Sequence, residues 1–143
     1  MNDERVIAEA LGKILGRAFR GRLYSDLTHG IAEGLNESTY PVLSAVARAD
    51  GSPSARDIAL EVGTDRSVVS RRAATLAAAG LIDTVGGPDR RAVYYALTSL
   101  GTEATTVMRR RLDAAIAEHI GDWAQDDISR FARLLTTFSE KPL

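Results

Sequence analysis

The sequence predicts a mainly helical fold that carries one small β-hairpin. Along most of the chain apolar residues recur at helical spacing, as Ile7, Leu11 and Ile14 do, which is typical of amphipathic helices. One stretch differs, because residues 92–97 alternate with period two and follow the turn sequence Gly-Gly-Pro-Asp. The two periodicities together indicate helices on either side of a single hairpin.

The composition predicts one globular domain without cysteine chemistry. The chain has 143 residues, 45% of them hydrophobic, which is enough to bury a core. The absence of cysteine excludes disulfides, thiolate nucleophiles, peroxide sensing through a thiol and cysteine zinc sites. There is no run of about 18 apolar residues and no basic segment leading into an apolar one. We therefore expect no membrane span, no secretory signal and a cytoplasmic location.

The first helix is expected over residues 5–27, with Ile7, Leu11 and Ile14 on its apolar stripe. Gly12 and Gly16 lie one turn apart inside it, and each costs about 1 kcal/mol relative to alanine. Two interpretations of the pair stay open: close approach of another helix, or a locally flexible segment. Residues 29–34 then break the helix.

Capping signals predict where two short helices begin. In residues 38–49, Ser38 is the expected N-cap, and it places Pro41 in the first turn, where proline is tolerated. Ser54 and Asp57 have the spacing of a capping box that opens the next helix.

That second short helix, residues 54–62, is followed by a tight turn and a longer helix. Gly63 ends the short helix, Thr64 is the expected N-cap of the next one, and Gly80 follows the last turn of residues 64–79 as a C′ residue. Two helices joined by a tight glycine turn form a helix-turn-helix, in which the first helix braces the second against the major groove of DNA.

The longer helix has two unlike faces. Val69, Ala73 and Leu76 form a stripe that can be buried. The opposite side of the first two turns carries arginines and small hydroxyls, namely Arg66, Ser67, Ser70 and Arg71. Because the formal net charge is −1, nucleic-acid binding has to come from such local placement. The alternative is that these arginines are solvated surface charges.

A β-hairpin is expected directly after Gly80. Residues 81–85 and 92–97 are its strands, and its tip carries Asp89, Arg90 and Arg91. We expect Asp89 to pair with a neighbouring arginine and hold the tip, which leaves a guanidinium for phosphate or the minor groove. A helix-turn-helix followed by such a hairpin is a winged helix-turn-helix.

Both terminal regions are amphipathic helices outside this winged part. A long helix begins at Thr98 or Ser99 and carries Met108 and Leu112 on its stripe, and residues 128–138 form a last apolar face. A compact winged helix of roughly 70 residues does not cover all of these stripes. We therefore expect the terminal helices to fold together and onto a second copy of the chain, as a homodimer.

The order of elements and two segments give a specific resemblance. The segments SVVSRRAATLAAAGLI and GPDRRAVYYALTSLG, with Asp89-Arg90-Arg91, Leu97-Thr98 and Gly101 in the second, resemble the MarR family of bacterial transcriptional regulators. The resemblance covers nearly the whole chain. It implies a single domain over residues 1–143, with the winged helix-turn-helix at 36–97 and helical dimerisation parts at 1–30 and 98–143.

The resemblance implies a homodimeric regulator, usually a repressor, that binds a pseudo-palindromic operator and releases it when a small aromatic or phenolic ligand binds. Carried onto this chain, the major-groove residues are Arg66, Ser67, Ser70 and Arg71, and Thr64 is a further DNA-binding residue. The wing contacts are Arg90 and Arg91, and Asp89 supports the wing. The ligand-contacting residues expected near the junction of the two parts are Tyr24, His29, Tyr40 and Arg109. Pro41 departs from the family pattern, which continues a helix undisturbed there.

Other function classes have less support. A winged helix whose arginine face binds an acidic protein partner stays open, and salt-dependent binding to random duplex separates it from DNA binding. Nothing indicates an enzyme, since no nucleophile with a base, phosphate loop or metal-ligand spacing is found. Two histidines, His29 and His119, make a weak metal site, so no metal and no cofactor are expected. The run Arg109-Arg110-Arg111 is interpreted as a solvated face.

Overall fold

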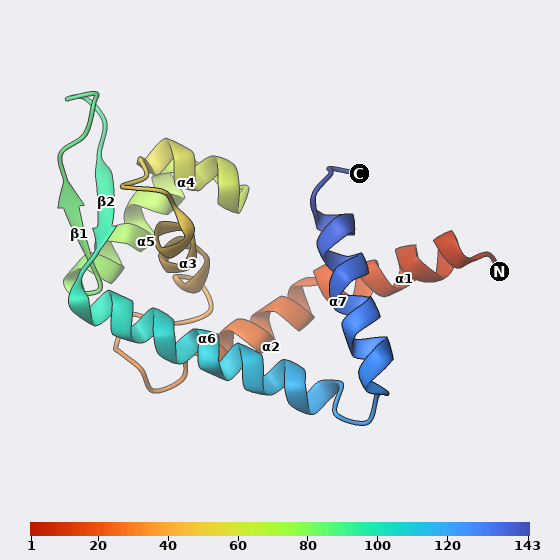
Figure 1. Ribbon diagram of the computed structural model, residues 1–143. Coiled ribbons are helices and arrows are strands. Elements are labelled where there is room, and N and C mark those ends of the chain that lie inside the picture. The colour runs from red at the N-terminus through yellow and green to blue at the C-terminus, as the bar shows by residue number, and fades with distance from the viewer. The chain divides into compact units, whose positions relative to one another are not determined.

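The computed structural model describes residues 1–143 and contains seven helices and one antiparallel hairpin (Figure 1). This confirms the predicted fold class of a mainly helical chain with a small hairpin. In chain order the elements are α1 (Asp3–Leu15), α2 (Arg17–Thr28), α3 (Tyr40–Arg48), α4 (Ala55–Val62), α5 (Arg66–Ala78), β1 (Ile82–Val85), β2 (Tyr94–Leu97), α6 (Ser99–His119) and α7 (Gln125–Ser139).

The chain forms two compact units, Met1–Arg109 and Arg110–Leu143. The first unit holds the hydrophobic core, which α3, α4, α5, the hairpin and the start of α6 build together. Val42, Leu76 and Leu81 are fully buried at its centre. The second unit contains α7, none of whose residues is buried.

The predicted long N-terminal helix is wrong, because Gly16 divides it. Gly16 has extended backbone angles (φ −61°, ψ 145°) and serves as the C-cap of α1 and the N-cap of α2. Glycine fits such a break because it gains little from remaining helical. Gly12, by contrast, stays helical and has no atom of another element within 4 Å of the position of an added Cβ. Within one chain, no helix packs against it.

The start of α3 differs by one residue from the prediction. Thr39, not Ser38, is the N-cap, and Pro41 lies in the first turn as expected. Asn36 explains the shift, because its side-chain oxygen accepts hydrogen bonds from the backbone N–H groups of Ser38 (2.9 Å) and Thr39 (3.2 Å). This Asx turn holds the backbone N–H groups of Ser38 and Thr39, so the helix begins at Tyr40 with Thr39 as its N-cap.

The helix-turn-helix forms from α4 and α5 as predicted. The capping box is complete: the Asp57 N–H donates to Ser54 Oγ (3.1 Å), and the Ser54 N–H donates to the Asp57 carboxylate (3.0 Å). These bonds, the one from the Ser54 backbone first, lower the pKa of Asp57 below its ordinary value. Gly63 ends α4 with a left-handed φ of 77°. The N-cap of α5 is Asp65, one residue after the expected Thr64.

The wing is pinned to the helix-turn-helix by a third extended segment. In the hairpin, Ile82 pairs with Leu97 and Val85 with Tyr94. Beside β2, the Tyr95 N–H donates to the Pro53 carbonyl (3.0 Å) and the Ala55 N–H donates to the Val93 carbonyl (3.1 Å). Ser54, the N-cap of α4, therefore forms an isolated antiparallel β-bridge with Tyr94 of β2.

A tight joint connects the end of α5 to the start of α6. Thr98 Oγ1 donates to the Gly80 carbonyl (2.6 Å) and accepts from the Gly101 N–H (3.0 Å), and the Thr98 N–H donates to the Leu81 carbonyl (3.1 Å). Gly101 lies so close to Leu81 that an added Cβ would overlap its carbonyl oxygen and lie 3.0 Å from its carbonyl carbon. The glycine of the predicted wing-to-helix signature is thus a position of close backbone contact.

Candidate nucleic-acid interface

The two faces of α5 are separated as the sequence predicts. Val69, Ala73 and Leu76 are completely buried in the core. The side chains on the opposite face, those of Arg66, Ser67, Ser70 and Arg71, are exposed. The buried stripe fixes the rotation of the helix, so the arginines and hydroxyls point to solvent as a set.

A hollow of about 690 Å³ joins this face to the wing; we call it the wing hollow. Its residues come from the start of α4, the exposed face of α5 and the hairpin, and include Arg56, Arg66, Ser67, Ser70, Asp89, Arg91 and Tyr94. Guanidinium groups from all three elements thus border one concave surface. Such a surface has the charge and the donors that phosphate and base edges require.

The expected DNA-contacting residues are only partly brought together. Arg71 and Arg90 are exposed but do not line the wing hollow, and Thr64 is half-buried and lines a different one. Arg56 lines the wing hollow although the sequence analysis did not single it out. The sequence feature that could have indicated Arg56 was its position inside the capping box of α4, the first helix of a helix-turn-helix.

The wing tip is held through its backbone. Asp89 Oδ1 accepts a hydrogen bond from the Arg91 N–H (2.9 Å), and the Asp89 N–H donates to the Tyr94 hydroxyl (3.2 Å). The ring of Tyr94 covers Gly87, where an added Cβ would overlap it. Asp89 therefore shapes the tip through a turn, and the expected ion pair with an arginine side chain is wrong. The arginine side chains at the tip are left to the solvent side.

A second hollow of about 500 Å³ lies between α2, α3, α4 and α5; we call it the arginine hollow. Its charged residues are Arg17, Arg20, Arg48, Arg72 and Glu61, and its aromatic residues are Tyr24 and Tyr40. The two rings contact each other in a tilted arrangement, with their centroids 4.4 Å apart and an interplanar angle of 34°. An adjoining hollow of about 710 Å³ shares Arg17, Arg20, Tyr24 and Arg72 and adds Arg22 and Glu37.

Two of the four predicted ligand-contacting residues meet in the arginine hollow. Tyr24 and Tyr40 contact each other there, whereas neither His29 nor Arg109 lines it or the adjoining hollow. The arginines of the hollow were missed because three different helices supply them. Only the spacing of Arg17, Arg20 and Tyr24, which places them on one side of α2, was readable in the sequence.

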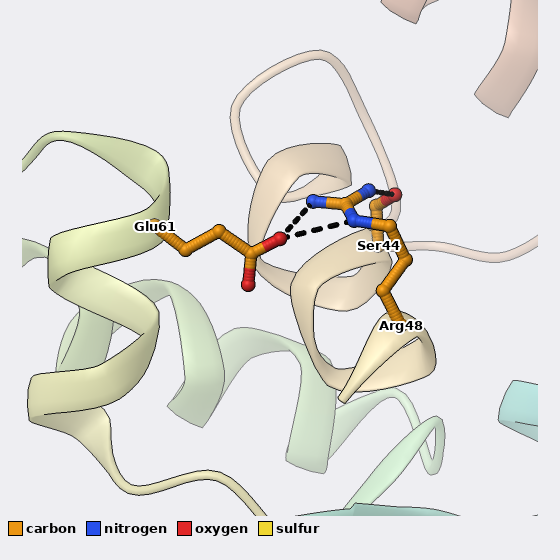
Figure 2. A network of polar contacts seen from close by, with 3 residues as sticks. All are labelled: Ser44, Arg48 and Glu61. Atoms are coloured by element: carbon orange, nitrogen blue, oxygen red, sulfur yellow. Dashed lines mark hydrogen bonds and ion pairs between the residues drawn. The ribbon is translucent and has the colours of Figure 1, made fainter. Parts of the chain in front are cut away.

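One ion pair crosses the arginine hollow and ties α3 to α4 (Figure 2). Arg48 donates from Nε (3.0 Å) and Nη2 (2.6 Å) to the same oxygen, Oε1 of Glu61. Its remaining nitrogen, Nη1, donates to the hydroxyl of Ser44, one turn earlier in α3. The Arg48 and Glu61 side chains are 55% and 43% exposed, so water competes for both.

Two further findings concern other kinds of site. The structure contains no group of three or more histidine, cysteine or acidic side chains placed to hold a metal ion. None of its helices combines the length and the hydrophobicity that crossing a bilayer requires.

The family model of the MarR family matches residues 33–92, which contain α3, α4, α5, β1 and the wing tip. Over this winged part the chain matches the MarR family. Members of that family are transcription regulators and not enzymes, so the match supports DNA-binding transcription regulation. No curated protein sequence matches it.

Several solved structures have the same fold over nearly the full length of the chain. RV1404 from Mycobacterium tuberculosis is 21% identical, with 98% of this chain and 94% of that one covered and a TM-score of 0.74. A MarR regulator from Methanosarcina mazei Go1 is 15% identical, with 95% of each chain covered and a TM-score of 0.78. PcaV from Streptomyces coelicolor, solved with its natural ligand, is 23% identical, with 98% and 96% covered and a TM-score of 0.64.

Proposed function

We propose that this protein is a homodimeric, cytoplasmic repressor of the MarR family that binds a pseudo-palindromic operator and releases it when a small molecule binds. The observation that carries the DNA-binding part is the wing hollow. It collects Arg56, Arg66 and Arg91 from three elements of a chain whose net charge is −1, and these three arginines outnumber the two carboxylates of the hollow, Asp57 and Asp89. Such a concentration of guanidinium groups on an acidic chain favours a polyanionic partner.

The roles of the interface residues follow from where their elements hold them. Arg66, Ser67, Ser70 and Arg71 lie on the exposed face of α5, so we assign them to the major groove and its base edges. Arg56 of α4 and the wing residues Arg90 and Arg91 are assigned to phosphate or the minor groove. Thr64 precedes the N-cap of α5 and lines the arginine hollow, so we assign it no base contact.

The dimer is supported by the apolar faces of α1 and α7. Neither helix has a buried residue. In α1 the side chains of Ile7 and Leu15 are 51% and 61% exposed, and in α7 those of Leu134 and Leu135 are 57% and 49% exposed. Apolar stripes of this kind are unfavourable in water and mark interfaces. A second copy of the chain supplies matching stripes in a closed, symmetric assembly.

The sensing part of the proposal is supported by the Tyr24–Tyr40 pair in the arginine hollow. Paired rings beside guanidinium groups form a site in which an aromatic or phenolic ligand can pack and hydrogen-bond. The similar structure of PcaV was solved with its natural ligand. Coupling of about 1–3 kcal/mol between ligand and operator is enough to weaken DNA binding 5- to 150-fold.

The test begins with selection of bound duplexes from a random DNA pool, followed by fluorescence anisotropy on the selected operator. Wild-type protein is expected to bind with an affinity that falls steeply with salt. Arg66→Ala should weaken binding about tenfold, which corresponds to about 1.4 kcal/mol. Arg130→Ala in α7 removes the same charge outside the candidate DNA interface, and this variant should bind the operator as wild type does. Equal binding by wild type and Arg66→Ala would refute the role of the α5 face, and binding to an acidic protein would then be the function to test.

A further inference from the structure

The arginine hollow carries a charge that its own carboxylate does not balance. Four arginines, Arg17, Arg20, Arg48 and Arg72, line it against the single carboxylate of Glu61, which leaves a net charge of +3. The whole chain has a net charge of −1, so this excess is local. Like charges that share a concave surface repel one another, and an anion that enters the surface relieves the repulsion.

The one carboxylate of the hollow, that of Glu61, already pairs with Arg48, but through only one of its oxygens. Both Arg48 nitrogens donate to the same Glu61 oxygen, so the pair lacks the two-oxygen fork that makes arginine–carboxylate pairs strong. Half-exposed ion pairs of this kind contribute little to the stability of the fold. A ligand that offers Arg48 two oxygens can therefore replace Glu61 at small cost.

The residues of this hollow touch both helices of the helix-turn-helix. Glu61 lies in the last turn of α4, two residues before the Gly63 turn, and Arg72 lies on α5 itself. Loss of the Arg48–Glu61 pair removes the only ion pair that joins α3 to the end of α4. A ligand that takes Arg48 and also contacts Arg72 consequently acts on the orientation of α5.

We propose that the ligand of the arginine hollow is a small oxyanion with two or more negative charges, and that it acts by displacing Glu61 from Arg48. The inference rests on the proposed release of operator by a small molecule, and it specifies both the charge of that molecule and the switch that it operates. Phosphate and carboxylate groups share the required chemistry, because each presents two oxygens to one guanidinium. The tyrosine pair supplies an aromatic wall for the rest of the ligand.

Direct binding tests this inference first without DNA. Pyrophosphate and citrate serve as the phosphate and carboxylate probes, and benzoate is the singly charged comparison, each titrated calorimetrically at matched ionic strength. We expect saturable binding of pyrophosphate, citrate or both, tighter than that of benzoate. The proposal would be overturned if neither probe bound saturably up to about 10 mM, because any binding free energy would then be weaker than about 3 kcal/mol.

Two substitutions then separate the switch from general attraction to positive charge. Arg20→Gln should weaken the bound probe about tenfold. Glu61→Gln should tighten it up to about fivefold, because Arg48 is no longer shared. Arg130→Gln in α7 removes a positive charge outside the hollow and should leave probe binding unchanged. Probe affinity that is unaltered in Glu61→Gln would overturn the switch.

Operator release completes the test and distinguishes this inference from the proposed function. The bound probe should weaken operator binding by wild type at least fivefold at constant ionic strength, and it should not do so in Arg20→Gln. If wild type binds the operator but the probe leaves that affinity unchanged, the inference fails and the DNA-binding function stands. If wild type binds no selected DNA, the proposed function itself fails.

Discussion

Replacement of Gly101 by alanine should disrupt the joint between α5 and α6. The new Cβ would overlap the Leu81 carbonyl, and both groups belong to backbone that is held by the bonds of Thr98 to Gly80 and Leu81. Overpacking costs about 1–3 kcal/mol, and backbone that cannot rotate away favours the upper end. The gain from alanine in a helix offsets at most about 1 kcal/mol of this. We expect a net loss of about 2–3 kcal/mol in the free energy of unfolding.

Gly12→Ala is the matched control for this prediction. It makes the same change inside a helix, but no atom of another element lies within 4 Å of its added Cβ. It should stabilise the protein by about 1 kcal/mol through helix propensity alone. Urea unfolding at one fixed protein concentration measures both variants, since the stability of a dimer depends on concentration.

Two results would contradict this reasoning in different ways. If Gly101→Ala has the same urea midpoint as wild type, the backbone at the joint can move to accept the new Cβ, and α5 is not held rigidly to α6. Gly12→Ala as unstable as Gly101→Ala would mean that Gly12 packs against another helix in the dimer. The second result would also decide between the two interpretations of the glycine pair in α1.

Three other perturbations have defined outcomes. Arg71→Ala should reduce the free energy of operator binding by about 1–3 kcal/mol per half-site and relax the preference at one base pair. Arg91→Ala should weaken binding to all duplexes alike and lower the slope of log affinity against log salt concentration by about one per subunit. Fluorescence anisotropy on operator and scrambled DNA distinguishes the two variants. Because its partners lower the pKa of Asp57 from 3.8, its ionised form stabilises the fold above that pH and this stabilisation is lost on acidification through the folded-state pKa. The urea midpoint of Asp57→Asn should thus differ from that of wild type more at neutral pH than at a pH well below 3.8. Leu134→Glu should convert the dimer to monomer in sedimentation velocity, and an unchanged sedimentation coefficient would exclude α7 from the interface.

The sequence predicted those parts of the fold that depend on local patterns. The capping box of Ser54 and Asp57, the left-handed Gly63 and the buried stripe of α5 are all properties of a few neighbouring residues. The family resemblance was stated for nearly the whole chain, and the family model matches its winged part, residues 33–92.

The misplaced boundaries have a common physical cause, which is competition between neighbouring groups of similar propensity. Asn36 forms an Asx turn that moves the N-cap of α3 from Ser38 to Thr39. Thr64 and Asp65 are both good caps, and the chain uses the second. Gly12 and Gly16 look alike in the sequence, yet only Gly16 breaks the helix.

The arginine hollow escaped sequence analysis for a different reason. Its members lie on separate helices, from Arg17 in α2 to Arg72 in α5, and their approach depends on tertiary packing. A periodic pattern within one segment of the sequence does not predict contacts between separate helices. The pairing of Arg48 with Glu61, 13 positions apart, is of the same kind.

The bonds of Pro53 and Ala55 to β2 have a consequence for the DNA sequence itself. Because the start of α4 is hydrogen-bonded to β2, we expect the helix-turn-helix, with its proposed base-reading helix α5, and the wing to move as one body within a protomer. The number of base pairs between the major-groove and minor-groove contacts of one half-site is then fixed. Any tolerance of altered length has to lie at the centre of the operator, where the two protomers meet. One base pair inserted within a half-site should therefore abolish binding that an insertion at the centre only weakens.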